Sequence, residues 1–403
     1  MLALAINQHR AGQLGDAERT YRQILDTDPG QPDCLHLLGI IAHQRGEHEK
    51  AVDLISRATA ARPFAPFHYN LGLALAALGR STEAAAEFEK AIVLNGNYAE
   101  AHSSLGDALS AQGRIEQALA SYERAAALKS SAEIQNKTGA MLLALGRYDD
   151  AIARCEHAAA MKPELVEAHM NLAKAHLGAG RLVEATAWAV RALELRETLE
   201  TKMLFVLCVR HTRASGEAGR VRALVLRGLT EPWGRPDELV PVAISMVMRN
   251  EALRATVARA ATQWPQRLAA EDVLHRSLQP ALTDPLLHAV LEVAANVDLA
   301  LEQFLTGVRR ALLERALRAL PDDPIDTPML RFFCALARQC FVNEYVFFRN
   351  PDETHEARKL RESARRRTCL QCSGVSALAR RCGGLRPARY AGSRRQPPDA
   401  GMA

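Results

Sequence analysis

The sequence predicts an all-α protein in which a solenoid of helix pairs is followed by an irregular helical domain and a disordered basic tail. Two observations predict the solenoid. A pattern of small and apolar residues returns every 33 or 34 residues, and apolar residues between its landmarks are spaced by three and four. No alternation of apolar and polar residues typical of strands rises above noise, so helices are expected throughout the folded part.

One glycine marks the same point of each repeat, and two other landmarks follow it. An alanine stands five residues later and a larger residue nine residues later, except for Ala189 in the last repeat. Because glycine tolerates positive φ at a helix end, we expect it to end the first of two helices in each unit. The small residues would let the paired helices approach closely, and the larger ones would fill the gap against the next unit. The glycines are Gly46, Gly79, Gly113, Gly146 and Gly180, the alanines Ala51, Ala84, Ala118, Ala151 and Ala185, and the larger residues Ile55, Phe88, Tyr122 and Cys155.

This signature resembles that of tetratricopeptide (TPR) repeats, including the unit-end prolines Pro29, Pro63 and Pro163. The resemblance covers residues 1–199 and implies a right-handed superhelix of helix pairs. Terminal repeats are commonly atypical, and the sixth unit has Ala173 seven residues before Gly180, where the four units before it have a glycine, and it lacks the aromatic residue. We therefore expect it to meet a different helical domain. The six units are residues 1–31, 32–64, 65–98, 99–131, 132–165 and 166–199.

A groove for a partner is predicted along the first helices of the units, because these line the concave side of such a stack. One face of these helices carries polar side chains, among them amides, which can donate to and accept from any peptide backbone. The asparagines resemble those with which O-linked N-acetylglucosamine transferase repeats hold substrate backbone. The alternative is that these are solvated helix residues without a ligand. The candidates are Tyr69, Asn70, Ser103, Ser104, Asp107, Asn136, Lys137, Asn171 and Lys174.

Three histidines, His68, His102 and His169, recur at the fourth position of their units. Neighbouring helices lie about 10 Å apart, whereas metal–ligand bonds measure about 2 Å. The three therefore cannot share one ion, and we expect packing histidines and no metal site.

Residues 200–363 keep helical spacing after the period is lost, with prolines between the segments. Helix starts are predicted at Thr327, before Pro328, and at Asn350. The first of these helices is apolar almost all round, which favours a central place in a bundle. Residues 298–362 resemble the helical domain that, in bacterial TPR proteins, precedes an S-adenosylmethionine-dependent methyltransferase domain. This resemblance implies that the recruiting and connecting parts are present and the catalytic part is absent.

No catalytic residue and no cofactor is predicted. A nucleotide pocket needs a strand leading into a glycine-rich turn, and the nearest candidate, residues 216–220, is predicted to lie between helices. P-loop, His-Glu-x-x-His and Gly-x-Ser-x-Gly patterns are missing. Cys334 and Cys340 are six residues apart on one predicted helix, which favours buried thiols over a reactive pair. The chain is therefore not expected to be an enzyme.

The net charge of +5 comes from residues 364–403, because no acidic residue lies between Ser363 and Pro398. The rest of the chain is mildly acidic, which argues against nucleic-acid binding by the folded body. This arginine-rich tail is expected to be disordered. Contact of its arginines with an anionic membrane or RNA is one alternative, and zinc binding by its cysteines is disfavoured. Out-of-frame translation of a coding sequence rich in G and C is another explanation for its composition.

The predicted function is that of a non-catalytic scaffold that binds a protein or an extended peptide in the groove. The alternative is the substrate-recruiting part of a truncated methyltransferase or, less favoured, of an O-GlcNAc-type glycosyltransferase. No apolar run reaches the roughly 20 residues that a bilayer requires, so no transmembrane segment is predicted. Scattered cysteines and the lack of a secretory signal favour a cytoplasmic location.

Overall fold

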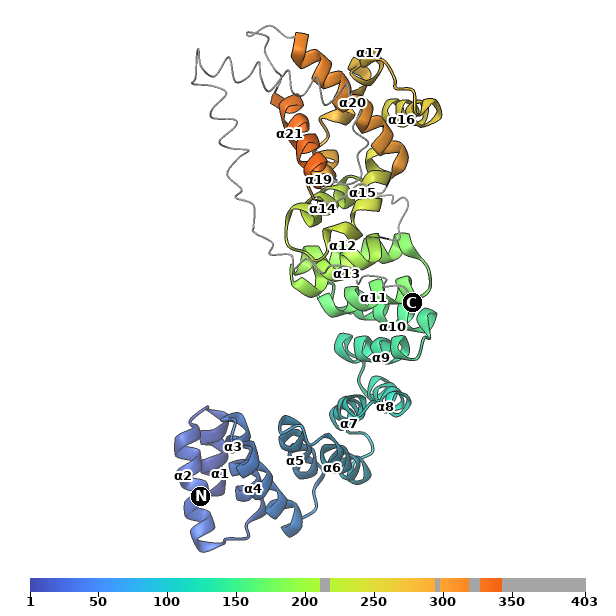
Figure 1. The fold of residues 1–403 in the computed structure, drawn as a ribbon. Coiled ribbons are helices and arrows are strands. Elements are labelled where there is room, and N and C mark those ends of the chain that lie inside the picture. Colours follow the sequence, from blue (N-terminus) through green and yellow to red (C-terminus); the bar gives the residue numbers. More distant parts are fainter. Residues whose placement is uncertain (211–217, 294–297, 319–326, 343–403) are drawn as a thin grey trace, which may run out of the picture. The chain divides into compact units, whose positions relative to one another are not determined.

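The structure, a computed structural model, describes residues 1–210, 218–293, 298–318 and 327–342. Within these ranges it contains helices and no strand (Figure 1), which confirms the predicted all-α class. The helices of the six predicted units are α1 (Leu2–Arg10), α2 (Leu14–Thr27), α3 (Pro32–Gln44), α4 (His48–Ala61), α5 (Ala65–Ala77), α6 (Ser81–Leu94), α7 (Ala99–Ala111), α8 (Ile115–Leu128), α9 (Ala132–Ala144), α10 (Tyr148–Met161), α11 (Val166–Gly178) and α12 (Leu182–Leu195). The later helices are α13 (Leu199–Val209), α14 (Ala218–Thr230), η1 (Pro236–Glu238), α15 (Val240–Val247), α16 (Glu251–Gln263), α17 (Ala270–Val273), η2 (Arg276–Leu278), α18 (Gln279–Leu282), α19 (Pro285–Val293), α20 (Leu299–Arg318) and α21 (Thr327–Val342).

The chain divides into two compact units, Met1–Met246 and the part from Val247 onward. In the first unit, every helix from α1 to α13 packs against the next one in the chain. First helices of neighbouring pairs also contact each other, as α5 does with α3 and α7. Figure 1 shows these pairs following one another in chain order, which confirms the predicted solenoid. The helix after the sixth predicted repeat, α13, contacts α11 and α12 in the same manner.

Each helix pair turns at a glycine in the left-handed region. These glycines have φ between 73° and 80°, as the sequence predicted, and they are Gly12, Gly46, Gly79, Gly113, Gly146 and Gly180. The backbone N–H of the following residue returns to a carbonyl of the first helix, as from Arg80 to Leu75 and from Arg114 to Leu109. This closure satisfies carbonyls that a helix end would otherwise expose.

In four of the six pairs, a large side chain of the second helix lies on a glycine of the first helix. Phe88 covers Gly72 so closely that a Cβ atom on the glycine would lie 2.5 Å from Cε1 of the ring. The same contact joins Ile55 to Gly39, Tyr122 to Gly106 and Cys155 to Gly139.

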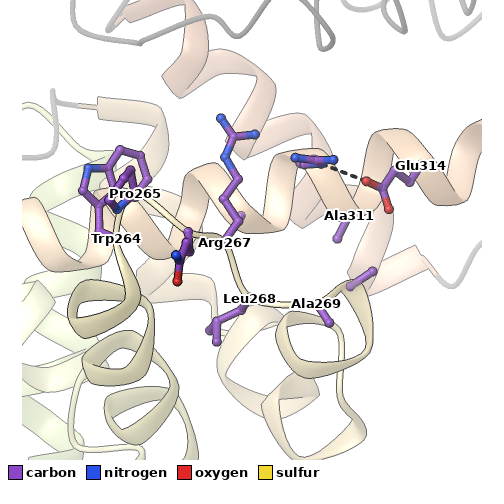
Figure 2. A pocket seen from close by; sticks show the side chains of 11 residues that line it. Trp264, Pro265, Arg267, Leu268, Ala269, Ala311 and Glu314 are labelled. Atoms are coloured by element: carbon purple, nitrogen blue, oxygen red, sulfur yellow. Dashed lines mark hydrogen bonds and ion pairs between the residues drawn. The ribbon is translucent and has the colours of Figure 1, made fainter.

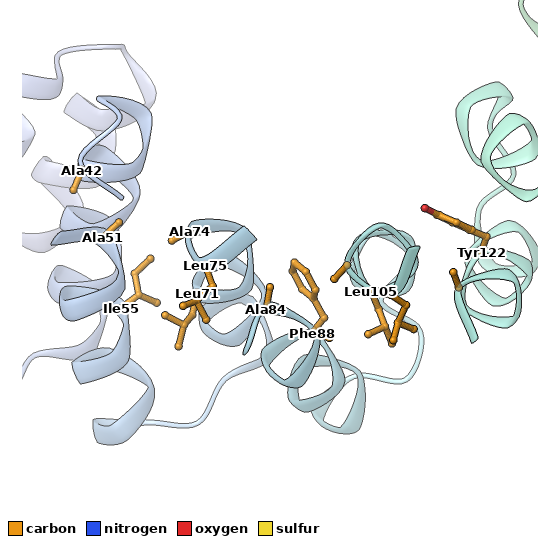
Figure 3. Close-up of a cluster of buried hydrophobic side chains, with 14 residues drawn as sticks. Ala42, Ala51, Ile55, Leu71, Ala74, Leu75, Ala84, Phe88, Leu105 and Tyr122 are labelled. Atoms are coloured by element: carbon orange, nitrogen blue, oxygen red, sulfur yellow. The ribbon is translucent and has the colours of Figure 1, made fainter. Parts of the chain in front are cut away.

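The prediction that these larger residues fill the gap to the next unit holds only in part, because each of them also lies against the glycine of its own pair. They border the next unit as well, since Phe88 and Leu105 belong to one buried cluster (Figure 3). Within a pair, however, a small residue faces a large one and not a second small one. The reason is volume: a ring lying over a bare backbone fills the space that two small residues would leave empty.

In four helix pairs, an ion pair joins the end of the second helix to the start of the first helix. A basic residue at the end of the second helix contacts an acidic residue in the first turn of the first helix, with N···O distances of 3.0 Å for Lys129–Glu100 and for Lys162–Glu133. Arg62–Asp33 and Arg196–Glu167 repeat this arrangement. Because all are solvent-exposed, they contribute little to stability.

In the second unit, α20 packs against α16 and α17, and α21 packs against α19. Helix α21 begins at Thr327, as predicted, and buries Phe332, Ala335 and Leu336. The predicted helix start at Asn350, the remainder of the predicted domain to residue 363 and the predicted tail of residues 364–403 lie outside the described residues. Among the helices that the structure describes, none has the length and apolar character needed to cross a bilayer.

The packing of rings on glycines yields a stability prediction. Gly106→Ala should lower the free energy of unfolding by about 1–3 kcal/mol, because the new methyl group overlaps the ring of Tyr122, which lies 2.7 Å from an ideal Cβ position. Urea unfolding followed by circular dichroism measures the change.

The matched control is Gly15→Ala in α2, where nothing lies within 4 Å of the added atom. This substitution should be neutral or stabilising by up to about 1 kcal/mol, since alanine favours helix. Equal effects of the two substitutions would contradict the packing described above.

Candidate functional site

The nine predicted groove residues lie on four successive first helices. Tyr69 and Asn70 belong to α5, the next three to α7, two to α9 and the last two to α11. None of the nine is fully buried, and Asp107 and Lys174 are exposed. The structure therefore leaves this face, which we call the first-helix face, accessible to a ligand.

Two predicted asparagines meet across neighbouring repeats. The amide nitrogen of Asn171 on α11 donates to Oδ1 of Asn136 on α9 over 2.9 Å. An amide has two N–H donors and one acceptor oxygen, so Asn136 keeps its NH2 group and Asn171 keeps its oxygen available. A donor and an acceptor side by side match the C=O and N–H groups of an extended peptide backbone.

A second cross-repeat bond involves a residue that the sequence analysis missed. The amide nitrogen of Asn70 donates to Nε2 of His36 on α3 over 2.8 Å, so this ring nitrogen carries no proton. Burial lowers the pKa of His36 to about 4, which keeps the ring neutral and able to accept. His36 precedes Gly39 by three residues, as Asn136 precedes Gly139, so applying the repeat register to the second unit could have found it.

An ionic bridge interrupts the amides in the middle of the face. Lys137 on α9 lies 2.7 Å from Asp107 on α7, and the hydroxyl of Tyr122 donates to the same carboxylate over 2.7 Å. Burial and this hydrogen bond raise the pKa of Tyr122 well above its ordinary value. Further along, Lys174 lies 3.7 Å from Glu200 on α13. The two predicted lysines are thus paired with carboxylates.

The remaining predicted residues are one tyrosine and two serines, and they differ in their contacts. The ring of Tyr69 lies between those of Phe88 and Tyr98, with centroid distances of 5.9 and 4.9 Å. Tyr98 was missed because it precedes α7 and so falls outside the helical spacing. Ser103 and Ser104 are half-buried, and their hydroxyls make no hydrogen bond within the described residues. The first-helix face therefore carries a cluster of aromatic rings and two hydroxyl groups without a hydrogen-bond partner among the described residues.

The three recurring histidines each have a separate partner, as expected of packing residues. His68 bonds to Glu87 over 2.7 Å, His102 to the carbonyl of Gly96 and His169 to the carbonyl of Pro163. The described residues contain no group of three or more His, Cys, Asp or Glu side chains that could hold a metal ion.

A cleft of about 570 Å³ lies in the second unit (Figure 2). Its walls are residues 264–270 and one side of α20. Arg310 on that wall donates to Glu314 over 2.8 Å, so these two charges compensate each other. Neither a thiol, a hydroxyl nor an imidazole is among the described lining residues of this cleft.

The thiols are poorly suited to chemistry as well. Cys34, Cys155 and Cys208 are buried, and burial raises their pKa values to about 11, 12 and 12. The prediction that Cys334 is buried was wrong, since it is only half-buried. At about 100° per residue, it lies on nearly the opposite side of α21 from the buried Phe332. The side chain of Cys340 lies outside the described residues.

Family models match most of the repeat region. Models of the tetratricopeptide repeat match residues 2–66, 99–131 and 142–196, and a TPR repeat model matches residues 72–113. The chain contains tetratricopeptide repeats. No curated protein matches it.

Several solved structures are similar to part of this chain. The MamA protein is 26% identical, with 41% of this chain and 92% of that chain covered and a TM-score of 0.40. YrrB, described as a TPR protein with an unusual peptide-binding site, is 18% identical, with 46% and 96% covered and a TM-score of 0.42. The C-terminal part of a TPR repeat-containing protein from Cytophaga hutchinsonii is 11% identical, with 59% and 98% covered and a TM-score of 0.49.

The lowered pKa of His36 makes the TPR array sensitive to acid. The unfolded chain protonates this histidine near its ordinary pKa of 6.5, whereas the folded chain resists protonation down to about 4. Stability from the neutral ring is therefore complete above pH 6.5 and falls as the pH drops toward 4, by about 3 kcal/mol at most. Urea midpoints measured between pH 7 and pH 4 test this.

The variant His36→Gln should show a smaller loss of stability over this range than the unchanged chain. The exposed His157 provides the control, and His157→Gln should leave the pH dependence as it is. Parallel pH profiles for the His36→Gln and unchanged chains would contradict the assignment.

Proposed function

We propose that the TPR array is a non-catalytic scaffold whose first-helix face binds an extended peptide segment of a partner protein. The observation that carries the proposal is the bond between Asn171 and Asn136. It fixes both amides in place and leaves one donor group and one acceptor oxygen, which together suit a peptide backbone. Asn70, held by His36, is an anchored amide like Asn171 and lies three repeats before it.

Anchored amides favour binding for an energetic reason. A mobile surface asparagine loses side-chain entropy when it binds a ligand, whereas an asparagine already held by a hydrogen bond has lost most of it beforehand. Solvated helix residues, the alternative considered from the sequence, would have no need of such bonds between neighbouring repeats. The paired lysines at 137 and 174 leave the face without a strong net charge, so backbone recognition is favoured over recognition of a charged partner.

The proposal includes a cytoplasmic location, since three free thiols are buried in the helical core and no disulfide joins them. It also includes the absence of nucleic-acid binding by the folded body. Lys129, Lys162 and Arg196 support this part, because each is already paired with a carboxylate.

A recruiting role for a methyltransferase is the second candidate. It rests on the resemblance of residues 298–362, of which the structure describes α20 and α21 as helices. Incubation with labelled S-adenosylmethionine and a bound partner tests whether the chain transfers a methyl group by itself. Transfer above the level of a heat-denatured sample would overturn the non-catalytic assignment.

Selection of a displayed library of random peptides on the full chain tests the groove. For a selected peptide, the double variant Asn136→Ala/Asn171→Ala should weaken binding about tenfold or more, because two hydrogen bonds of about 1 kcal/mol each are lost. Titration calorimetry measures the affinity. Changing both asparagines at once leaves neither amide without its partner.

The control is Arg191→Ala on α12, a second-helix residue with an exposed side chain. It should leave the affinity unchanged, and circular dichroism should show the same helix content for both variants. If the double variant binds the selected peptides as tightly as the unchanged chain does, the asparagines are not the binding site.

A further inference from the structure

Helix α13 carries an exposed apolar stripe. Leu199, Met203 and Leu207 lie on one side of the helix, four residues apart, and their exposed fractions are 62%, 56% and 37%. Most of the opposite side is buried, including Phe205 and Cys208. Contiguous exposed apolar side chains of this kind mark interaction surfaces in folded proteins.

The preceding repeat shows what this position normally contacts. Counting back 33 residues, Met203 corresponds to Met170 and Leu199 to Val166, and these two are exposed by only 5% and 6%. Two residues of the same type, at the same register, thus differ tenfold in exposure. The difference arises from the neighbours, because α11 is covered by α13.

The cross-repeat hydrogen bonds confirm the direction in which this register position faces. His36 lies three residues before Gly39 and Asn136 three residues before Gly139, as Met170 lies three residues before Ala173. Both contact the next first helix, through Asn70 and Asn171. By the same register, Met170 faces Leu204 of α13, which is buried to 5% exposure. Met203 faces the place that a further first helix would take.

We propose that an amphipathic helix of a partner protein docks along α13 in that place. The occupant is a helix because the interface continues the stack of first helices, in which each helix is covered by the next one. It needs apolar residues at spacings of three and four to meet the stripe, as other groove-bound helices do. The docking site is separate from the asparagines and goes beyond the proposed peptide binding.

The chemistry around the stripe agrees with apolar recognition. Glu200 lies by Lys174, and Lys202 is 2.8 Å from Glu197, so the nearby charges already have partners. A charged peptide would find little unpaired charge there. Three side chains also offer too little area for a stable dimer, which requires about 1,200 Å² or more in total. A partner helix, adding to the stack, fits better than a second copy of the chain.

The probe is a fluorescent peptide of residues 198–210, the helix that covers Met170 in the chain itself. Anisotropy titration of the full chain should show saturable binding at micromolar concentrations. Met203→Glu in the chain should weaken binding at least tenfold, and so should Leu204→Glu in the peptide. Val93→Glu on α6, where the valine is 85% exposed, is the matched control and should leave binding unchanged.

Oxidation by dilute peroxide, read by mass spectrometry, tests the surface without any substitution. Met203 should oxidise readily and Met170 slowly, and the peptide should protect Met203 but not Met161, which is 45% exposed on α10. Slow oxidation of Met203 in the free chain would overturn the proposal, because the chain itself would then cover the stripe.

Two other results would also overturn it: equal peptide binding by the unchanged and Met203→Glu chains, or a concentration-dependent dimer in sedimentation that Met203→Glu abolishes. The outcome is independent of the proposed peptide groove. Asn136→Ala/Asn171→Ala should leave the helical probe bound, whereas Met203→Glu should leave the selected extended peptides bound.

Discussion

The contact of a large side chain with a glycine, found inside four of the six helix pairs, is the constraint on which the repeat region depends. Where Phe88 lies on Gly72, or Tyr122 on Gly106, no other residue than glycine leaves room for the ring. This contact sets the distance between the two helices and the position along their axes at which they pack. Because these four pairs are built alike, the contact also sets the register at which one of them meets the next.

That register determines what the first helices can do. It brings residues of successive repeats into contact, and the pairs differ from repeat to repeat although the geometry is the same. Asn171 and Asn136 offer hydrogen-bonding groups to a ligand, whereas the charges of Lys137 and Asp107 compensate each other. Met203 on α13, at the end of the described row of first helices, is 56% exposed. One repeated geometry thus provides a polar face along the stack and an apolar face at its end.

Much of the fold was predictable, because its causes are local in the sequence. The positive-φ glycines, the helix pairs and the start of α21 at Thr327 all follow from patterns a few residues long. The site was less predictable. His36 and Tyr98 were missed although they touch predicted residues, since no groove position was predicted in the repeat that contains His36 and Tyr98 lies just before a helix. The exposure of Cys334 depends on which side of α21 meets α19.

By itself, the sequence determined the period, the turns and the residue types on the first-helix face, because helix periodicity and glycine stereochemistry act within single repeats. Only the tertiary structure decided which residues meet. Phe88 packs inward on its own glycine, His36 becomes the acceptor for Asn70, and Met203 stays exposed where Met170 is covered. Each of these depends on the placing of a helix about 33 residues away, which is set by packing between repeats and not by local preference.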